Sequence, residues 1–122
     1  MRSWLTSVIR SFSPALAGVA WALKTQRNLQ FHAGATVLVL VFGLWLRIAA
    51  WEWCAVMLAT GMVWTAELMN TALEVLADRV SKEREEAIRR AKDTAAGAVL
   101  MAALGALGVG LMVFLPKLWQ LL

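Results

Sequence analysis

Acidic and amide side chains recur along one stretch of the sequence that is otherwise apolar. Glu67, Asn70, Glu74 and Asp78 follow one another at spacings of three, four and four residues. At about 100° per residue, this spacing places the four side chains within an arc of about 80° on one helix face. Ionisable groups within a membrane helix cost ~2.5 kcal/mol or more each to insert and normally serve a function. The pattern indicates a chemically active face, although Asp78 beside Arg79 also fits a simple solvated ion pair.

This acidic face would run from inside a lipid bilayer to its edge. Along a helix that starts at Trp53, a rise of ~1.5 Å per residue places Glu67 about 21 Å and Asp78 about 37 Å from the start. The hydrocarbon core of a bilayer is ~30 Å thick. A membrane-embedded group and a water-soluble group could therefore meet on this face.

A lysine and an aspartate lie at the start of the next apolar segment. Lys92 and Asp93 could bring their charges to the acidic face if the two segments pack as an antiparallel pair. A lysine there could hold a phosphate group as a point charge. Alternatively, Asp93 only begins a helix and Lys92 only extends to the membrane surface. His32 has no second ligand at a suitable spacing, so we interpret it as a polar interface residue rather than a metal ligand.

The composition excludes several classes of protein. Of the 122 residues, 61% are hydrophobic, and the mean hydropathy of +0.66 is too high for a soluble domain of this size. The net charge is +4, but the basic residues alternate with acids and flank apolar segments, which argues against nucleic acid binding. Cys54 alone permits neither an internal disulfide nor a cysteine-based zinc site. The motifs of soluble nucleotide-binding proteins are absent, so a nucleotide would have to bind by other means.

The apolar segments predict an all-α membrane protein with a single domain over residues 1–122. Residues 1–30 are predicted to form an amphipathic helix in the membrane interface, with Pro14 as a candidate kink or break. Three transmembrane helices are expected, together with a charged helical connection in water. The predicted transmembrane helices span 33–51, 53–77 and 94–115, and the connection spans 78–93.

The boundaries of these spans carry aromatic and charged residues. Only Trp51, Glu52 and Trp53 separate the first two apolar runs, which predicts a tight hairpin with aromatic residues at its tip. Arg47, near the end of the first run, would extend its side chain towards water. Pro116 and the residues after it mark the predicted end of the third span.

Lysine and arginine residues are distributed unevenly around the predicted spans. Ten of the 12 lie either before the first span or between the second and the third. The positive-inside rule makes these regions cytoplasmic, so the hairpin tip and the C-terminus would face outward across the membrane. The ten residues are Arg2, Arg10, Lys24, Arg27, Arg79, Lys82, Arg84, Arg89, Arg90 and Lys92.

Small residues recur at every fourth position of the third predicted span. Ala98, Ala102, Ala106 and Gly110 would allow helix backbones to approach closely. Three spans alone make a thin bundle with little interior for polar groups, so oligomerisation is expected, without a predicted subunit number. The alternative is that the alanines only supply helix propensity.

Two strings in the sequence carry a family resemblance. Residues 66–74 read AELMNTALE, followed by Asp78 and Arg79, and residues 91–100 read AKDTAAGAVL. The acids, the asparagine and the Lys-Asp pair resemble, in type and spacing, the bacterial integral-membrane diacylglycerol kinase family, which includes undecaprenol kinases. Within that family, residues 24–28 and His32 are more similar to the undecaprenol kinase branch. The resemblance covers roughly residues 12–117.

The resemblance implies a homotrimer with composite active sites between subunits. Such an enzyme would transfer the γ-phosphate of ATP, with Mg²⁺ as cofactor, to a membrane lipid alcohol, undecaprenol or diacylglycerol, at the cytoplasmic surface. This chemistry requires a base for the alcohol, cations for the phosphate charge and in-line alignment. The implied roles are general base for Glu67, magnesium ligand for Glu74, polar support for Asn70, phosphate binding for Lys92, and nucleotide-site or supporting acids for Asp78 and Asp93.

One position departs from the family pattern. The family usually has a second magnesium-binding glutamate where this chain has Gln26. An amide oxygen can coordinate magnesium but lacks the charge of a carboxylate. The departure implies weaker magnesium binding, greater reliance on phosphate oxygens, recruitment of another acid, or a catalytically impaired homologue.

Two other functions compete with a lipid kinase. A small proton- or cation-coupled transporter would also carry intramembrane carboxylates, but it predicts acids near the bilayer midplane and inverted repeats. Here the acids run to one interface, and no internal repeat is present. A structural or regulatory membrane subunit would give no reason for the acidic face.

Overall fold

Every regular element of the described chain is an α-helix. The computed structural model describes residues 2–80 and 85–122, and Lys82 and Arg84, which were counted in the predicted charge asymmetry, lie outside these residues. The all-α prediction is confirmed. The helices are α1 (Arg2–Thr25), α2 (Arg27–Trp45), α3 (Ala50–Val80) and α4 (Glu86–Leu121).

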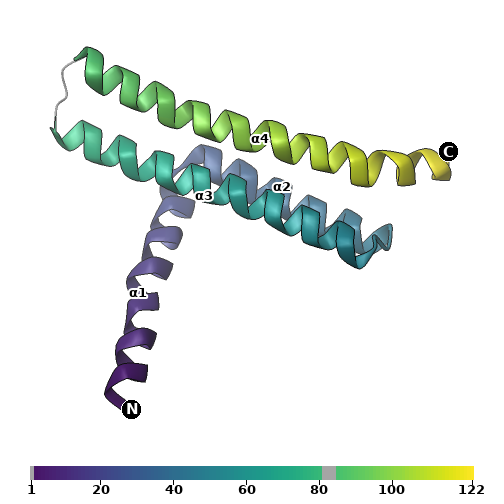
Figure 1. Cartoon of the computed structure of the whole chain (residues 1–122), viewed down its shortest axis with the longest axis horizontal. Coiled ribbons are helices and arrows are strands. Elements are labelled where there is room, and N and C mark those ends of the chain that lie inside the picture. The colour runs from purple at the N-terminus through teal and green to yellow at the C-terminus, as the bar shows by residue number, and fades with distance from the viewer. Residues whose placement is uncertain (1, 81–84) are drawn as a thin grey trace.

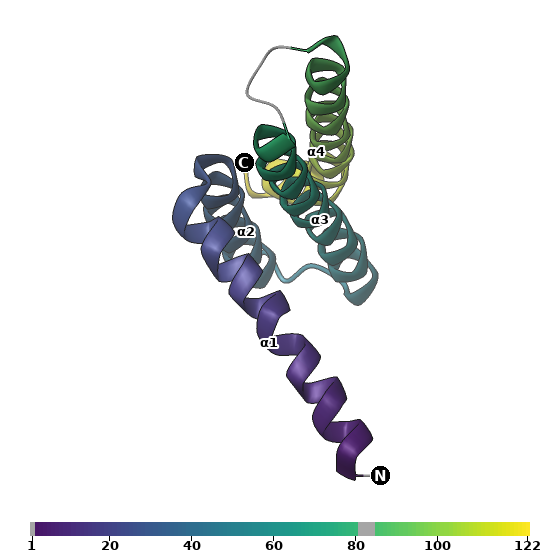
Figure 2. The same cartoon turned by 90° about the vertical axis from the view of Figure 1, so that its left-hand side faces the viewer.

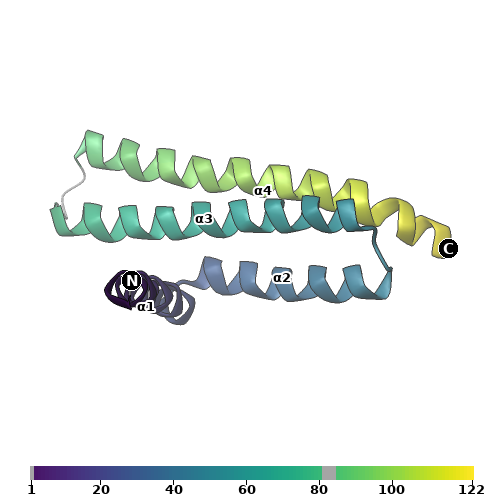
Figure 3. The same cartoon turned by 60° about the horizontal axis from the view of Figure 1, so that its bottom comes forward.

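Three of the helices form a bundle, and the first points away from it. Helices α2, α3 and α4 run alongside one another, with α3 antiparallel to both neighbours, whereas α1 projects steeply from the start of α2 (Figures 1, 2 and 3). Large apolar side chains of α1, among them Ile9, Phe12 and Leu16, are exposed. Pro14 lies inside α1, which continues through it without a break. An exposed apolar stripe is what an interfacial helix buries in lipid.

The chain bends between α1 and α2 at Gln26. This residue has an extended backbone, with φ −103° and ψ 113°, so the amphipathic helix ends at Thr25 rather than near residue 30. The Gln30 side-chain amide of α2 donates to the carbonyl of Leu23 at 2.9 Å. This hydrogen bond satisfies a carbonyl at the C-terminus of α1 that the helix itself leaves free.

The turn between α2 and α3 comes earlier than predicted. Helix α2 ends at Trp45 instead of residue 51, and Arg47 adopts a left-handed conformation with φ 52°. The N–H of Arg47 donates to Leu44 at 3.3 Å, and that of Ile48 donates to Gly43 at 3.2 Å. These two bonds form a Schellman motif, which glycine usually closes and arginine closes here. Arg47 therefore lies in the turn and not within a span, which corrects the sequence prediction.

Glu52 fixes the start of α3. Its Oε1 accepts the N–H of Ala49 at 2.9 Å and lies 3.2 Å from Nζ of Lys117 in α4. The Ala49 hydrogen bond, followed by the Lys117 contact, lowers the pKa of this carboxyl. A glutamate that reaches back to the N–H preceding its helix is one half of a capping box. The predicted hairpin tip, residues 51–53, consequently belongs to the first turn of α3.

Helix α4 is longer than the third predicted span. It begins at Glu86, passes through Pro116 and ends at Leu121, so Pro116 does not terminate it. Residues 78–80 and 86–93 of the predicted connection are helical, but Glu85 between them is extended, with φ −68° and ψ 141°. The charged residues on both sides therefore continue α3 and begin α4.

By length and composition, α2 and α4 could each cross a membrane. Their mean hydropathies are 1.4 and 2.5, and only 11% and 6% of their apolar windows are buried, unlike the core helices of soluble proteins. Helix α3 does not pass the same test, and it carries the acidic face within its 31 residues.

Glycine allows one close helix contact inside the chain. A Cβ built on Gly43 of α2 would lie 2.5 Å from Cη2 of Trp53 in α3. The small residues Gly97, Gly105, Gly108 and Gly110 of α4 are different, because a Cβ there would meet nothing within 4 Å. The close approach expected from α4 therefore does not occur through these glycines within the described chain.

Gly43→Ala is expected to destabilise the protein by about 1–3 kcal/mol, because the added methyl group overlaps the Trp53 ring. Gly34→Ala in the same helix is the matched control, since nothing lies within 4 Å of its added Cβ. Helix propensity alone would make that change stabilising by up to ~1 kcal/mol. Thermal unfolding in detergent measures both variants, and equal stability would contradict the Gly43–Trp53 contact.

Candidate active site

The acidic face of α3 runs from a buried end to an exposed end, as its spacing predicts. Glu67 and Asn70 are buried, with 3% and 8% of their surface exposed, whereas Glu74 is half-buried and Asp78 is exposed. The Asn70 side-chain amide donates to Oε1 of Glu74 at 3.4 Å. The carbonyl oxygen Oδ1 of Asn70 is buried and has no hydrogen-bond partner among the described residues. The face thus presents a buried carboxylate at one end and an unpaired oxygen beside a second carboxylate.

His32 of α2 contacts the buried end of this face. Its Nε2 lies 3.2 Å from Oε1 of Glu67, and the side chains are 19% and 4% exposed. The sequence analysis placed His32 at an interface but did not predict this partner. A signal was present, because His32 and Glu67 lie at similar distances in sequence from the turn that reverses the chain. In an antiparallel helix pair, such residues lie at similar depths.

Lys92 of α4 reaches the exposed end of the face. It forms an ion pair with Asp78 of α3, which confirms the contact expected from antiparallel packing. Asp93 does not meet the face, because its carboxylate pairs with Arg89 at 3.4 Å and is largely exposed. The Arg89 and Arg90 side chains also bond Glu86, and these bonds lower the pKa of the Glu86 carboxyl. The start of α4 therefore carries its own local network of charges.

The Gln26 side chain bonds a neighbouring residue and not Glu74, the other predicted metal ligand. Its side-chain amide donates to Oγ1 of Thr25 at 3.2 Å, and it makes no hydrogen bond to Glu74. Within residues 2–80 and 85–122, no three His, Cys, Asp or Glu side chains gather closely enough to hold a metal ion. A metal bound at Glu74 would therefore need further ligands from amide oxygens, phosphate groups or a second chain.

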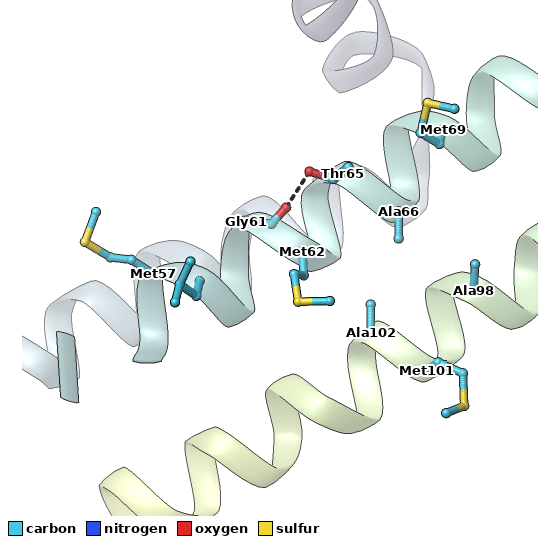
Figure 4. Close-up of a pocket in the computed structure, with 10 residues that line it drawn as sticks. Met57, Gly61, Met62, Thr65, Ala66, Met69, Ala98, Met101 and Ala102 are labelled. Atoms are coloured by element: carbon cyan, nitrogen blue, oxygen red, sulfur yellow. Dashed lines mark hydrogen bonds between the residues drawn. The ribbon is translucent and has the colours of Figure 1, made fainter. Parts of the chain in front are cut away.

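An apolar groove lies between α3 and α4, on a different side of α3 from the acidic face. Its volume is about 690 Å³. Ala66 and Met69 of α3 line the groove opposite Ala98 and Ala102 of α4 (Figure 4). The other lining residues are Met57, Leu58, Gly61, Met62, Thr65 and Met101. None of the acidic-face residues lines the groove, so α3 presents its polar and apolar surfaces on different sides.

Comparison with known proteins identifies the family. Residues 13–114 match the model of the family described as prokaryotic diacylglycerol kinase. The chain belongs to this family. Membership in the prokaryotic diacylglycerol kinase family makes it a lipid kinase and a bacterial membrane protein, and it disfavours the transporter alternative. The resemblance found in residues 66–100 is therefore confirmed.

Curated relatives match along most of this prokaryotic diacylglycerol kinase family member. An undecaprenol kinase of Bacillus subtilis is 38% identical over 117 residues, which cover 96% of this chain and 95% of that protein. A diacylglycerol kinase of Synechocystis is 39% identical over 117 residues, covering 95% of this chain and 67% of that protein. A diacylglycerol kinase of Escherichia coli is 28% identical over 97 residues, or 80% of each chain.

Proposed function

We propose that this chain transfers the γ-phosphate of ATP to the hydroxyl group of undecaprenol at the cytoplasmic surface of the membrane. The observation that carries the proposal is the arrangement of the acidic face. A carboxylate buried among apolar helices lies at one end, at Glu67, and a half-buried cation, Lys92, pairs with exposed Asp78 at the other. A lipid alcohol reaches the buried end through the bilayer, and a nucleotide reaches the exposed end from water.

Membrane topology follows from the same arrangement. The three spans are α2, residues 53–77 of α3 and residues 94–115 of α4, with α1 lying in the interface. The N-terminus and the charged residues around the α3–α4 connection face the cytoplasm, where positive charge is favoured. The end carrying Glu52 and Lys117 then faces outward.

Each side chain of the face has a distinct task. Glu67 removes the proton from the lipid hydroxyl, and Lys92 holds the phosphate groups of ATP as a point charge. Asp78, paired with Lys92, keeps the ammonium group directed at the face. Asp93 and its partner Arg89 lie at the nucleotide entrance. The lipid oxygen attacks the γ-phosphorus as the bond to ADP breaks, so positioning and charge supply most of the catalysis.

The oxygen atoms near Glu74 fit a magnesium ion. Asn70 Oδ1 is buried and unpaired among the described residues, and it lies on the residue that bonds the Glu74 carboxylate. Magnesium in kinases is held by one or two protein groups together with phosphate oxygens, which this small donor set allows. Glu74 and Asn70 would hold the ion with Gln26 as a further oxygen donor, and the ion would neutralise phosphate charge.

A homotrimer completes the site. The glycines of α4 meet nothing inside the chain, and large apolar side chains are exposed on every helix. The described residues also provide fewer than three acidic or histidine ligands in one place. A neighbouring subunit packed against α4 would use the small residues for close contact and add groups to the nucleotide site.

Undecaprenol is the proposed substrate because the chain aligns with the undecaprenol kinase of Bacillus subtilis over nearly the full length of both proteins. The apolar groove between α3 and α4 offers a surface for a hydrocarbon chain and extends along α3 to Ala66 and Met69. Release of ADP by the purified protein, measured with undecaprenol, with diacylglycerol and without lipid, tests the proposal. We expect release to depend on lipid and kcat/KM to be higher for undecaprenol. Lipid-independent release would contradict a lipid kinase, and preference for diacylglycerol would contradict the choice of substrate.

Gln26→Glu is expected to lower the magnesium concentration for half-maximal activity about fivefold, since an added charge near the ion contributes ~1 kcal/mol in a hydrated site. The measurement is a magnesium titration of activity at saturating ATP. Asn28→Asp, which adds a carboxylate at an exposed position two residues away, is the control for a general charge effect. An unchanged magnesium requirement in Gln26→Glu would show that Gln26 lies outside the metal site.

A further inference from the structure

His32 is the one described side chain that bonds the proposed base. Its Nε2 lies 3.2 Å from Oε1 of Glu67, and within the described residues Glu67 has no other hydrogen-bond or ionic partner. A buried carboxylate with one partner has one oxygen held and the other free to accept a proton. The direction of that free oxygen is consequently set by the imidazole.

A second contact between α2 and α3 fixes the imidazole at this depth. The indole N–H of Trp64 in α3 donates to Oγ1 of Thr36 at 2.9 Å, and Thr36 Oγ1 donates to the backbone carbonyl of His32 at 2.7 Å. Thr36 lies one helical turn after His32, and Trp64 lies one turn before Glu67. The two polar contacts therefore lie about one helical turn apart between the same two helices. The Trp64–Thr36 hydrogen bond holds α2 and α3 in the register that the His32–Glu67 contact requires.

We propose that His32 is the positioning residue for Glu67. Its Nε2–H donates to Glu67 Oε1 and turns the second oxygen towards the lipid hydroxyl. This inference rests on the proposed function and adds a residue from α2 to the α3 face. The His32 side chain touches neither ATP nor the lipid in this role.

His32 gains no proton at any step of the reaction. The lipid O–H bond breaks as its oxygen bonds the γ-phosphorus, the proton passes to the free oxygen of Glu67, and the bond from the γ-phosphorus to ADP breaks. Glu67 then returns the proton to water when the phosphorylated lipid leaves. His32 orients Glu67 before the reaction and thereby affects the chemical step more than ATP binding.

A series of variants at position 32 tests this role through kcat and KM for ATP. His32→Gln places an N–H donor where Nε2 lies, whereas His32→Asn is too short to reach Glu67 with its amide. General base catalysis contributes about 10²–10⁴-fold, so losing the orientation should lower kcat at least about tenfold. We expect His32→Asn and His32→Leu to show that loss with KM for ATP within about twofold of wild type, and His32→Gln to regain much of the rate. The Gln and Asn variants decide the question if the leucine variant fails to fold.

Two further comparisons distinguish a positioning role of His32 from structural damage caused by its replacement. Thr36→Val removes the neighbouring polar contact that supports the α2–α3 register, and it should lower kcat less than His32→Asn, which removes the contact with Glu67 itself. In a Glu67→Gln background, His32→Asn should cause no additional loss, because the carboxylate it serves is absent. Equal rates for the Gln and Asn variants, an equal loss in both backgrounds, or a wild-type rate in His32→Asn would each overturn the proposal. A wild-type protein without lipid phosphorylation, or an active Glu67→Gln, would instead show that the proposed function itself is wrong and remove the basis for the role.

Discussion

Glu67→Gln is expected to lower kcat for lipid phosphorylation by about 10²–10⁴-fold, the usual contribution of a general base. Glutamine is close in shape to glutamate but cannot take up the proton of the lipid hydroxyl. Since this proton moves only as the reaction proceeds, KM for ATP should change little. Steady-state kinetics with undecaprenol and MgATP measure both constants, and size-exclusion chromatography in detergent checks that the oligomer remains intact.

Glu52→Gln is the matched control for this substitution. Glu52 is also a buried glutamate of α3, but it lies at the opposite end of the helix beside Ala49 and Lys117. Its replacement should weaken the turn and leave kcat near the wild-type value. A kcat within a few-fold of wild type in Glu67→Gln would rule out Glu67 as the base.

Lys92→Gln should lower kcat by about 10²–10³-fold and raise KM for ATP, because loss of one preorganised group that binds transition-state charge costs this much. Lys92 is the cation that the structure brings from α4 to the acidic face, where Asp78 holds it. The measurement is again steady-state kinetics, now with ATP varied over a wide range. A decrease in affinity without any loss of kcat would show that Lys92 binds the nucleotide but not the transferred phosphate.

Arg89→Gln provides the comparison for Lys92. Arg89 precedes Lys92 on the same helix, yet its guanidinium bonds Glu86 and Asp93 rather than the α3 face. We expect a much smaller effect on kcat than in Lys92→Gln. Similar losses in the two variants would attribute the effect to overall positive charge at the start of α4 instead of to the Lys92–Asp78 contact.

The acidic face and its partner on α4 could be predicted because helical geometry alone determines them. Side chains three and four residues apart share a face, so Glu67, Asn70 and Glu74 had to line up once α3 was a helix. The contact of Lys92 with Asp78 followed from two helices that reverse at a short connection. Asp93 could not be placed in this way, since an adjacent residue on a helix points about 100° away.

The turn between α2 and α3 was predicted at the wrong place because no break in the hydrophobic pattern marks it. Arg47 takes the left-handed position that usually calls for glycine, so the usual glycine signal is absent. Glu52 was read as part of the hairpin tip between the aromatic residues Trp51 and Trp53, although a glutamate at the third helical position also caps a helix start. Pro116 was read as a helix end, but α4 continues through it.

The pairing of His32 with Glu67 could not be derived from either helix by itself. It depends on the register of α2 against α3, and the misplaced turn shifted that register by several residues. The full set of metal ligands and the number of subunits could not be derived either, because both depend on more than one chain. Close approach of α4 to a partner and additional ligands for Glu74 both require groups that the described residues do not bring together.

Transfer of labelled γ-phosphate from MgATP to undecaprenol by the purified protein is the most direct test of the central claim. We expect labelled undecaprenyl phosphate with γ-labelled ATP, none with α-labelled ATP, and loss of the product when magnesium is chelated. No labelled lipid from either undecaprenol or diacylglycerol, at saturating magnesium and with the oligomer intact, would contradict lipid phosphorylation by this protein.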